Sequence, residues 1–379
     1  MKNRNAKGGG SVRQRDDGTW EARCTINGKR RSFYGEKQSE ALKAMRAAQS
    51  AADNGNYTEP SKNTVEQWMT IWLEEYVKTS AKPLTYSAYK SKVATHIIPA
   101  LGKVKLSALN PTQVQSFYND LHREKKLSPK SIKDVHGILH RAIEQAVELR
   151  YIPYNATNAC KTPRVIKKEI QPFEDIDIEA FLAAIEGHRY QDIFTVTLFT
   201  GMREGEACGL PWSAVDFRSG TITVKQQLCK EKTKGGKHYI DTPKHDKVRT
   251  LTAPPFVMDI LKDVKTKQLQ NHINCVGDWQ NEHNLVFTDE RGKYTVPATL
   301  RKHFKAIAAK MGKPDARFHD LRHTYAVTSL QEGDDYKTVQ QNLGHATAAF
   351  TLNVYGHVSE KMRQESANRM QRFYQRVKS

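Results

Sequence analysis

The sequence predicts a multidomain α+β protein with three parts: a small three-stranded β-sheet with one helix, an α-helical bundle, and a mixed, mainly helical domain with a small antiparallel sheet. Three observations predict this class. At 379 residues the chain is longer than one ordinary domain. The apolar spacing changes along the chain from alternation at every second residue to helical periodicity, and then to a mixture of the two. A composition that is 38% hydrophobic and 9% aromatic provides enough apolar side chains for more than one core.

The predicted sheet and its helix lie in residues 1–60. The stretch VRQRDDGTWEARCTINGKRRSFYGE alternates polar and apolar residues, and Asp-Gly and Asn-Gly turn signals interrupt it. We expect an antiparallel meander there, followed by a helix over KQSEALKAMRAAQSAADNG. The strands carry many basic residues, and a ribbon of this width can enter a DNA major groove. A solvated hairpin is the alternative interpretation.

Helical spacing begins at Thr64, the expected N-cap of TVEQWMTIWLEEYV. Three more periodic stretches follow, and each starts or stops at Pro, Gly, Asn or Ser: PLTYSAYKSKVATHIIPALG, NPTQVQSFYNDLHREK and SPKSIKDVHGILHRAIEQAVEL. We therefore expect a four-helix bundle over residues 64–160. Its aromatic residues are expected mostly in the core, whereas its lysines could line a face that contacts a nucleic-acid backbone.

Residues 161–172, KTPRVIKKEIQP, combine two prolines with a basic run and show little periodicity. This pattern predicts an extended linker. A segment of this length reaches about 40 Å, which is enough to pass alongside a DNA duplex. Two basic domains joined in this way could clamp DNA from opposite sides.

Residues 173–379 predict the mixed domain. The expected helices IDIEAFLAAIEGH, RYQDIFTVTLFTG and EGEACGLPW come first, the strands GTITVKQQL, HYIDTPK and VRTLTAP follow, and helices then return. The sequence contains no internal repeat, no glycine-rich phosphate loop and no low-complexity tract.

The charge balance favours a polyanionic partner. Lys and Arg number 60 against 41 Asp and Glu, which gives a formal net charge of +19. Five dispersed cysteines without a CxxC pair indicate a reducing compartment and argue against a disulfide framework. No apolar run is long enough to span a membrane, and the first residues lack the apolar core of a secretory signal. We expect a cytoplasmic protein that binds nucleic acid; a generally basic, solvated surface is the alternative.

The stretch RFHDLRHTYA places His319, Arg322 and His323 at spacing i, i+3, i+4, so that one helix face carries all three. Histidines at this spacing can bind zinc, but the glutamate of the metalloprotease motif is absent and Arg322 would repel a cation. The remaining alternatives are a structural cluster and a cradle for an anion. Arginine suits an anion because its planar fork pairs with two phosphate oxygens. We expect no metal site.

Two other segments of the same domain add residues of this kind. TGMREGEACGL places Arg203 at the start of a helix, where the backbone dipole favours an anion. Glu206 follows at i+3, so its carboxylate can hold the Arg203 guanidinium or a nearby lysine. QNLGHATAAFTLNVYGHV places His345 after a glycine turn and Tyr355 further along the same segment.

These motifs resemble the boxes of the tyrosine recombinases, the phage-integrase family. TGMREGE, HDLRHTYA and LGHATAAFTLNVYGH match that family in order and spacing. The resemblance covers the last domain closely and the helical bundle in layout, and the first 60 residues are similar to the arm-binding domains of integrases from phages and conjugative transposons. It implies an arm-type DNA-binding domain at 1–60, a core-binding domain at 64–160, and a catalytic domain with a C-terminal tail helix at 173–379.

The resemblance also implies the reaction and the residues that perform it. The enzyme would cut and rejoin DNA at specific sites through a covalent 3′-phosphotyrosine, and so integrate and excise a mobile genetic element. Tyr355 would be the nucleophile, His319 the general base, His345 a phosphate-positioning residue and Lys244 the general acid. Arg203 and Arg322 would stabilise the charge that builds on the phosphate, with Glu206 in a supporting role. No cofactor is expected, because the two guanidiniums supply the positive charge.

Some of these assignments leave alternatives open. Near Lys244 the sequence also offers Lys232, Lys234, Lys237 and Lys247. His323 could be an ordinary helix-face residue. The tyrosines that compete with Tyr355 are Tyr325, Tyr336 and Tyr374.

The expected partner is double-stranded DNA with core-type and arm-type sites. The resemblance implies a homotetramer on DNA, in which the tail after Tyr355 docks on a neighbouring protomer, although packing on its own domain is the alternative. Excisionase and DNA-bending proteins are candidate accessory partners. The residues expected to contact DNA are Arg13, Arg15, Arg23, Arg30, Arg31, Lys90, Lys92, Lys130, Lys133, Arg164, Lys167 and Lys168.

Three other functions compete with recombination. A DNA-binding regulator with a decayed catalytic domain would bind DNA without cutting it. A type IB topoisomerase would share the chemistry but has less use for a second DNA-reading module. A zinc hydrolase would need the metal that the HDLRH pattern does not favour.

Overall fold

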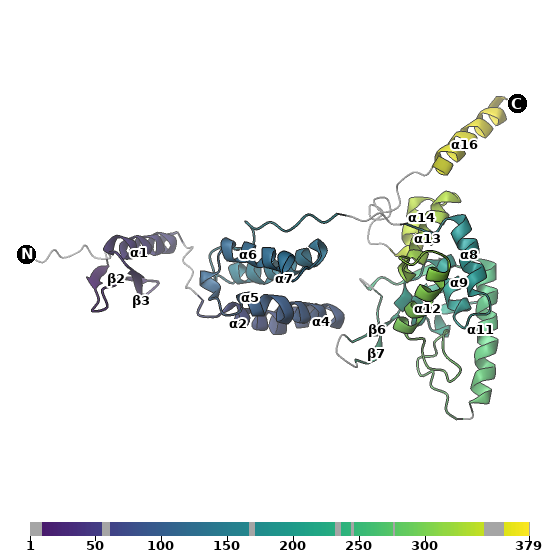
Figure 1. The fold of residues 1–379 in the computed structure, drawn as a ribbon, viewed down its shortest axis with the longest axis horizontal. Helices are drawn as coiled ribbons and strands as arrows, with labels where there is room; N and C mark the ends of the chain where they lie inside the picture. Colours follow the sequence, from purple (N-terminus) through teal and green to yellow (C-terminus); the bar gives the residue numbers. More distant parts are fainter. Residues whose placement is uncertain are drawn as a thin grey trace, which may run out of the picture. The chain divides into compact units, whose positions relative to one another are not determined.

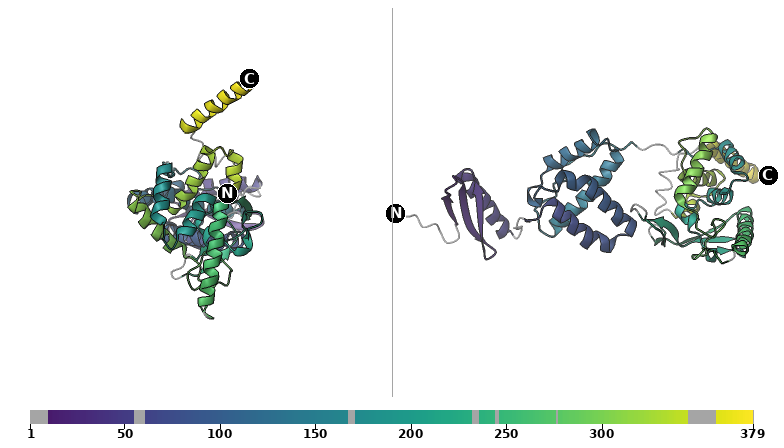
Figure 2. Two further views of the ribbon diagram at one scale, coloured as in Figure 1. Left: turned by 90° about the vertical axis from the view of Figure 1, so that its right-hand side faces the viewer. Right: turned by 60° about the horizontal axis from the view of Figure 1, so that its bottom comes forward.

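The computed structural model describes residues 10–54, 61–166, 171–231, 236–243, 246–275, 277–344 and 360–378. The chain divides into two compact units, Met1–Ile166 and Lys167–Ser379. Figures 1 and 2 show the elements of each unit in chain order. Within the described part, no helix is both long and apolar enough to cross a membrane.

The N-terminal module is the predicted antiparallel meander with one helix on one face. Turns at Gly18 (φ +81°) and at Asn27 and Gly28 (φ +51° and +75°) connect the strands, which explains the Asp-Gly and Asn-Gly signals. Ala22, Cys24 and Ile26 point to one face of the sheet and pack on the helix. The elements are β1 (Ser11–Gln14), β2 (Trp20–Ile26), β3 (Lys29–Gly35) and α1 (Gln38–Asp53).

The second part of this unit is the predicted helical bundle. Thr64 caps the first helix as expected, because its side chain accepts a hydrogen bond from the Gln67 N–H. Trp68 is fully buried, and its indole N–H donates to the Ala142 carbonyl at 2.7 Å. Two of the four predicted helices contain a wide π-turn, η1 or η2, which the periodicity did not indicate. The elements are α2 (Val65–Ile71), η1 (Trp72–Val77), α3 (Lys78–Ser80), α4 (Pro83–Lys92), η2 (Val93–Ile97), α5 (Ile98–Leu101), η3 (Leu106–Ala108), α6 (Pro111–Arg123) and α7 (Pro129–Glu148).

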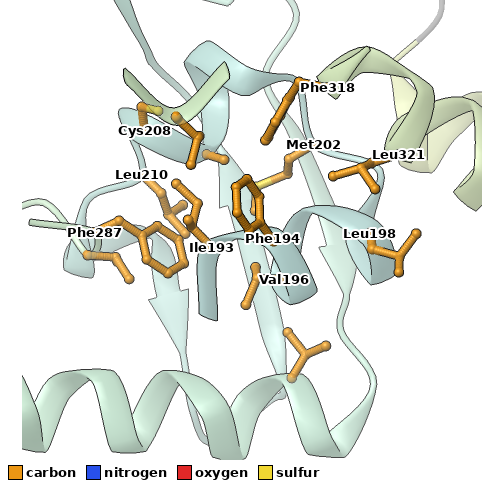
Figure 3. Close-up of a cluster of buried hydrophobic side chains, with 14 of the residues drawn as sticks. Ile193, Phe194, Val196, Leu198, Met202, Cys208, Leu210, Phe287, Phe318 and Leu321 are labelled. Atoms are coloured by element: carbon orange, nitrogen blue, oxygen red, sulfur yellow. The ribbon is translucent and has the colours of Figure 1, made fainter. Parts of the chain in front are cut away.

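The second unit is mainly helical, as predicted. Its core gathers around α9, against which α11 and α13 pack. Figure 3 shows Phe194 of α9 close to Met202, with Phe318 and Leu321 of α13 nearby. The helices are α8 (Asp175–Ile185), α9 (Gln191–Thr200), α10 (Glu204–Cys208), η4 (Trp212–Ala214), α11 (Pro255–Asn274), α12 (Pro297–Lys310), α13 (Phe318–Gln331), α14 (Tyr336–Leu343) and α16 (Glu360–Lys378).

The strands of this unit form two small antiparallel sheets, with orders β4-β5-β8 and β6-β7. The stretch GTITVKQQL, expected as one strand, is divided between them. Gly205 and Gly209 of the α10 segment leave no room for a Cβ against the Gln227–Leu228 backbone, so β6 is held on α10 and separates from β5. The strands are β4 (Val215–Asp216), β5 (Thr221–Val224), β6 (Gln227–Lys230), β7 (His238–Asp241) and β8 (Arg249–Thr252).

Candidate active site and nucleic-acid interface

Arg203 stands where three segments of the second unit meet. Gly201 ends α9 in the left-handed conformation (φ +63°), and Arg203 is the N-cap of α10. A Cβ at Gly201 would lie 2.5 Å from the Tyr325 ring and 2.6 Å from a methyl group of Leu343. Only glycine therefore fits this turn, which brings Arg203 close to α13 and the end of α14.

Glu206 holds Arg203 from two directions, as its i+3 spacing predicts. Its carboxylate accepts from the Arg203 guanidinium at 2.6 Å and from the Arg203 backbone N–H at 2.8 Å. Arg249 of β8 donates two more bonds to the same carboxylate, at 3.1 and 2.7 Å. Burial alone raises the pKa of Glu206, but Arg249 and then Arg203 outweigh it and lower the pKa to about 2. The carboxylate is therefore ionised at every physiological pH.

Arg322 is buried in α13, with 1% of its surface exposed. Its guanidinium donates to the Gly201 carbonyl at 2.7 Å and to the Leu343 carbonyl at 2.5 Å. Both acceptors are backbone carbonyl oxygens, and the two bonds together fix the orientation of the guanidinium. The same helix turn that carries Arg322 is thus tied to the segment that carries Arg203.

His319 and His323 stack edge to face on α13, with their ring centroids 4.8 Å apart. Loss of hydration is the largest cause that lowers the pKa of His319 to about 4, and the charges of His323, Arg322 and Arg203 lower it further. Burial likewise lowers the pKa of His323 to about 4. Both rings are neutral near pH 7, as a proton acceptor must be. The His323 side chain is buried, whereas the His319 residue keeps part of its surface in contact with solvent.

Three predicted site residues, Lys244, His345 and Tyr355, lie outside the described residues, as do Lys232 and Lys234. The chain is described as far as Gly344, which ends α14 in the left-handed conformation (φ +64°) immediately before His345. The glycine turn expected before that histidine is therefore confirmed.

One competitor of Tyr355 is poorly placed for attack. The Tyr325 hydroxyl accepts a hydrogen bond from the Asn342 side chain at 3.0 Å, and burial raises the pKa of Tyr325 above its ordinary value. A phenol that is harder to ionise is a weaker nucleophile. Tyr374 lies on α16 with about half of its surface exposed.

Arg249 is not among the site residues that the sequence motifs predict. Its strand alternates buried and exposed residues, so that Arg249 and Leu251 face inward while Thr250 and Thr252 face outward. An arginine at an inward position of a strand needs a buried partner, and this was the available signal. The partner, Glu206, comes from an element more than forty positions earlier in the chain.

In the N-terminal module, the sheet face opposite α1 carries most of the predicted DNA contacts. In the strand register Arg13 pairs with Glu21 and Glu21 pairs with Tyr34, so these three share this outer face. The Glu21 carboxylate accepts from Arg13 at 2.8 Å and from Arg23 at 2.7 Å. Side-chain hydrogen bonds from Arg23 are the largest cause that lowers the pKa of Glu21 to about 2.

The other predicted arginines of the module divide between its two faces. Arg15 lies over the Tyr34 ring at 5.5 Å, and Arg30 pairs with Thr25 on the outer face. Arg31 instead pairs with Cys24, whose side chain packs on α1, so its strand position belongs to the opposite face. Glu21, which bonds both Arg13 and Arg23 on the outer face, is not among the residues predicted from the sequence.

The predicted basic residues of the bundle lie at its surface. Lys92 and Lys130 both bond Asp134, at 3.0 and 2.8 Å, whereas Lys90 stands 3.7 Å from Glu74. Lys133 is exposed on α7. Arg164 is exposed in the predicted linker, and Lys167 and Lys168 lie outside the described residues. Among the described residues, no group of three or more His, Cys, Asp or Glu could hold a metal ion.

Comparison with known proteins connects this arrangement to one family. Residues 173–362 match the model of the phage integrase family, and residues 64–122 match the N-terminal SAM-like domain of phage integrases. A "Tyrosine recombinase XerC-like" protein of Caldanaerobacter subterraneus subsp. tengcongensis is 32% identical over 356 residues, 89% of this chain and 90% of its own length.

Two solved structures share the fold. The Tn1549 transposon integrase, in complex with a circular intermediate DNA, has a TM-score of 0.69 at 21% identity and covers 82% of this chain and 100% of its own. A lambda integrase tetramer bound to a Holliday junction has a TM-score of 0.58 at 17% identity, over 89% of this chain and 96% of its own.

A multidomain α+β chain whose last domain gathers two arginines around a neutral histidine has the features of a tyrosine recombinase. The chain belongs to the phage integrase family, since the family model covers half of it and a relative above 30% identity covers most of it. It is a site-specific recombinase that cuts and rejoins DNA, with the fold class that the sequence predicts.

Proposed function

We propose that Arg203 and Arg322 grip one phosphate of the DNA while Tyr355 attacks it. The observation that carries this proposal is the shared anchoring of the two arginines. The Arg322 guanidinium bonds the Gly201 carbonyl, in the turn that leads into Arg203, and both charges act on His319. Guanidiniums fixed in this way can stabilise the charge that builds on the phosphate oxygens without reorganising during the reaction.

In the first step the Tyr355 oxygen bonds to phosphorus, and the bond from phosphorus to the 5′ oxygen of the next sugar breaks. The tyrosine proton goes to His319, which is neutral near pH 7 because its pKa lies near 4. Lys244 gives a proton to the leaving 5′ oxygen, and His345 positions the phosphate by a hydrogen bond. The phosphotyrosine keeps the bond energy, and attack by a 5′ hydroxyl reverses the same steps to rejoin DNA.

The chain's other domains supply the DNA sites. Residues 1–60 bind an arm-type site through the outer face of the sheet, where Arg13, Arg15, Arg23 and Arg30 lie. Residues 64–160 and 173–379 both bind the core-type site, with 161–172 as the linker between them. Phosphate contacts of this kind release counterions, so affinity falls steeply with salt.

Recombination takes place in a tetramer on DNA, in the cytoplasm of a bacterial cell, with excisionase and DNA-bending proteins as accessory partners. The C-terminal helix α16 suits a contact between protomers, because Met370, Phe373 and Val377 are each more than half exposed on it. These apolar side chains gain a buried environment if the helix docks on a neighbouring copy.

The substitution Tyr355→Phe tests the proposed chemistry. Incubated with a nicked suicide substrate, the variant is expected to bind DNA with unchanged affinity and to form no covalent adduct, because the attacking oxygen is missing. Tyr374→Phe is the matched control and should form adduct at the wild-type level. Covalent capture by Tyr355→Phe would refute the assignment, and binding without cleavage by the wild type would favour a regulator.

A further inference from the structure

We infer that Arg249 is a positioning residue for DNA cleavage, which aligns Arg203 through a shared carboxylate and fixes the end of α14. The inference rests on the proposed function, because it concerns how the arginine pair of that site is held. Arg249 would touch neither the DNA nor the reacting atoms.

The contact between Arg249 and Glu206 is buried and bidentate. The Arg249 side chain is 7% exposed and the Glu206 side chain is not exposed at all. Two terminal nitrogens of Arg249 bond the two oxygens of Glu206, at 3.1 and 2.7 Å. Because both carboxylate oxygens are bonded, this fork geometry fixes the orientation of the Glu206 carboxylate plane as well as its position.

The plane of that carboxylate decides where Arg203 points. The oxygen that accepts the 3.1 Å bond from Arg249 also accepts the 2.6 Å bond from the Arg203 guanidinium. The other oxygen bonds both Arg249 and the Arg203 backbone N–H. Without Arg249, the carboxylate would keep only its contacts to Arg203 among the described residues. It could then rotate, and the Arg203 guanidinium would move with it.

Arg249 also holds the segment that leads to His345. Its Nε donates to the Asn342 carbonyl at 2.7 Å, next to the Leu343 carbonyl that accepts from Arg322. A Cβ at Gly344 would lie 2.9 Å from the Arg249 side chain, so the backbone at Gly344 packs directly on that side chain. Arg249 and Arg322 therefore fix consecutive carbonyls at the end of α14.

A buried ion pair can also be purely structural, because the loss of one partner leaves an uncompensated charge in the core. The two roles differ in one measurable respect. If Arg249 acts through the charge of Arg203 on the phosphate, its removal matters less when the scissile phosphate carries no negative charge. A purely structural role predicts the same loss on either substrate.

The experiment compares Arg249→Met, Arg249→Lys and Arg203→Ala in the full-length enzyme. Single-turnover cleavage is measured at saturating DNA on two suicide substrates, one with a normal scissile phosphate and one with a neutral methylphosphonate. On phosphate we expect Arg249→Met to cleave roughly a hundredfold more slowly than wild type with unchanged DNA affinity. On methylphosphonate we expect the ratio of the wild-type rate to the Arg249→Met rate to be about tenfold smaller than on phosphate.

Arg249→Lys keeps one charge beside Glu206 but cannot form the fork, so it carries the test if Arg249→Met does not fold. We expect it to show the same dependence on the substrate with a smaller loss. The control is Arg291→Met, which removes an exposed arginine 3.9 Å from Asp278 and should cleave both substrates at the wild-type rate.

The outcomes separate this inference from the function on which it rests. Equal losses on both substrates for the Arg249 variants, with a charge-dependent loss for Arg203→Ala, would overturn only the positioning role. Equal losses for Arg203→Ala as well would overturn the assignment of Arg203 to the phosphate.

Discussion

Two carboxylates of this chain, one in each unit, hold two arginines apiece, and they differ in how much water reaches the arginines. Glu21 in the N-terminal sheet bonds Arg13 and Arg23, whose side chains are 61% and 33% exposed. Glu206 in the second unit bonds Arg203 and Arg249, whose side chains are 23% and 7% exposed.

This difference in the exposure of the arginines suggests different roles for the two arginine–carboxylate clusters. Ion pairs of exposed arginines contribute little to stability, but they can orient guanidiniums toward a DNA groove. Where an arginine is buried together with its carboxylate, as Arg249 is with Glu206, the contact is hard to rearrange, since loss of one partner leaves an unpaired charge in the core. The first arrangement suits recognition of an extended surface, and the second suits one phosphate in a fixed position.

The largest expected effect comes from neutralising Glu206. Glu206→Gln leaves Arg249 without its charged partner, and we expect the second unit to lose about 3–5 kcal/mol of unfolding free energy. Glu21→Gln, the matched change in the N-terminal sheet, should cost much less stability, because water reaches the side chains of both of its arginines. Urea unfolding monitored by hydrogen exchange measures the stability of the N-terminal module and of the second unit separately. Similar losses in both would remove the distinction between the two carboxylates.

A third carboxylate, Glu204, sharpens the comparison because it has one arginine instead of two. One of its oxygens bonds Arg301 at 2.8 Å, and the other is buried with no hydrogen-bond partner among the described residues. Burial raises the pKa of Glu204 to about 7, which Arg301 only partly opposes. A single exposed arginine therefore does not keep a buried carboxylate ionised.

This shift predicts how stability depends on pH. The folded protein holds the Glu204 proton up to about pH 7 whereas the unfolded chain loses it near pH 4.3, so Glu204 costs stability as pH rises through this window. Glu204→Gln should remove that cost. The difference in unfolding free energy between this variant and the wild type should therefore grow, in favour of the variant, by on the order of 1–3 kcal/mol from pH 5 to pH 8. Urea unfolding at the two pH values measures it. A difference between the two proteins that does not change with pH would contradict the raised pKa.

The smallest expected effect concerns DNA selectivity. Glu21→Gln frees Arg13 and Arg23 from their common anchor and adds one positive charge, so binding to scrambled DNA should tighten slightly. The ratio of affinities for the arm-type site over scrambled DNA should fall by about tenfold, roughly the worth of one base-reading contact. Fluorescence anisotropy at fixed salt measures both affinities. Glu36→Gln changes the same charge at an exposed position and should keep the ratio; an equal fall there would assign the effect to charge alone.

The sequence predicted the local features of the fold and of the site. The Asp-Gly and Asn-Gly signals predicted the meander, because Gly18 and Gly28 adopt positive φ angles that few other residues tolerate. The spacing of Arg203 and Glu206 predicted their contact, since residues at i and i+3 are neighbours on a helix. Such features depend on residues close together in the chain.

The features that the sequence did not predict depend on contacts between distant elements. Arg249 meets Glu206 only because β8 lies beside α10, and Arg322 finds its acceptors in the turns at Gly201 and Leu343. The break of GTITVKQQL into two strands follows from the close approach of Gly205 and Gly209 to β6. The alternation of β8 marks Arg249 as an inward-facing arginine, but nothing in the local pattern identifies Glu206 as its partner.

The covalent link between protein and DNA identifies the nucleophile. After reaction with a suicide substrate, the adduct can be digested and the DNA-bearing peptide identified by mass spectrometry. We expect the modified peptide to contain Tyr355, joined to the 3′ phosphate of the cleaved strand. A phosphate on Tyr325, Tyr336 or Tyr374 instead would contradict this assignment.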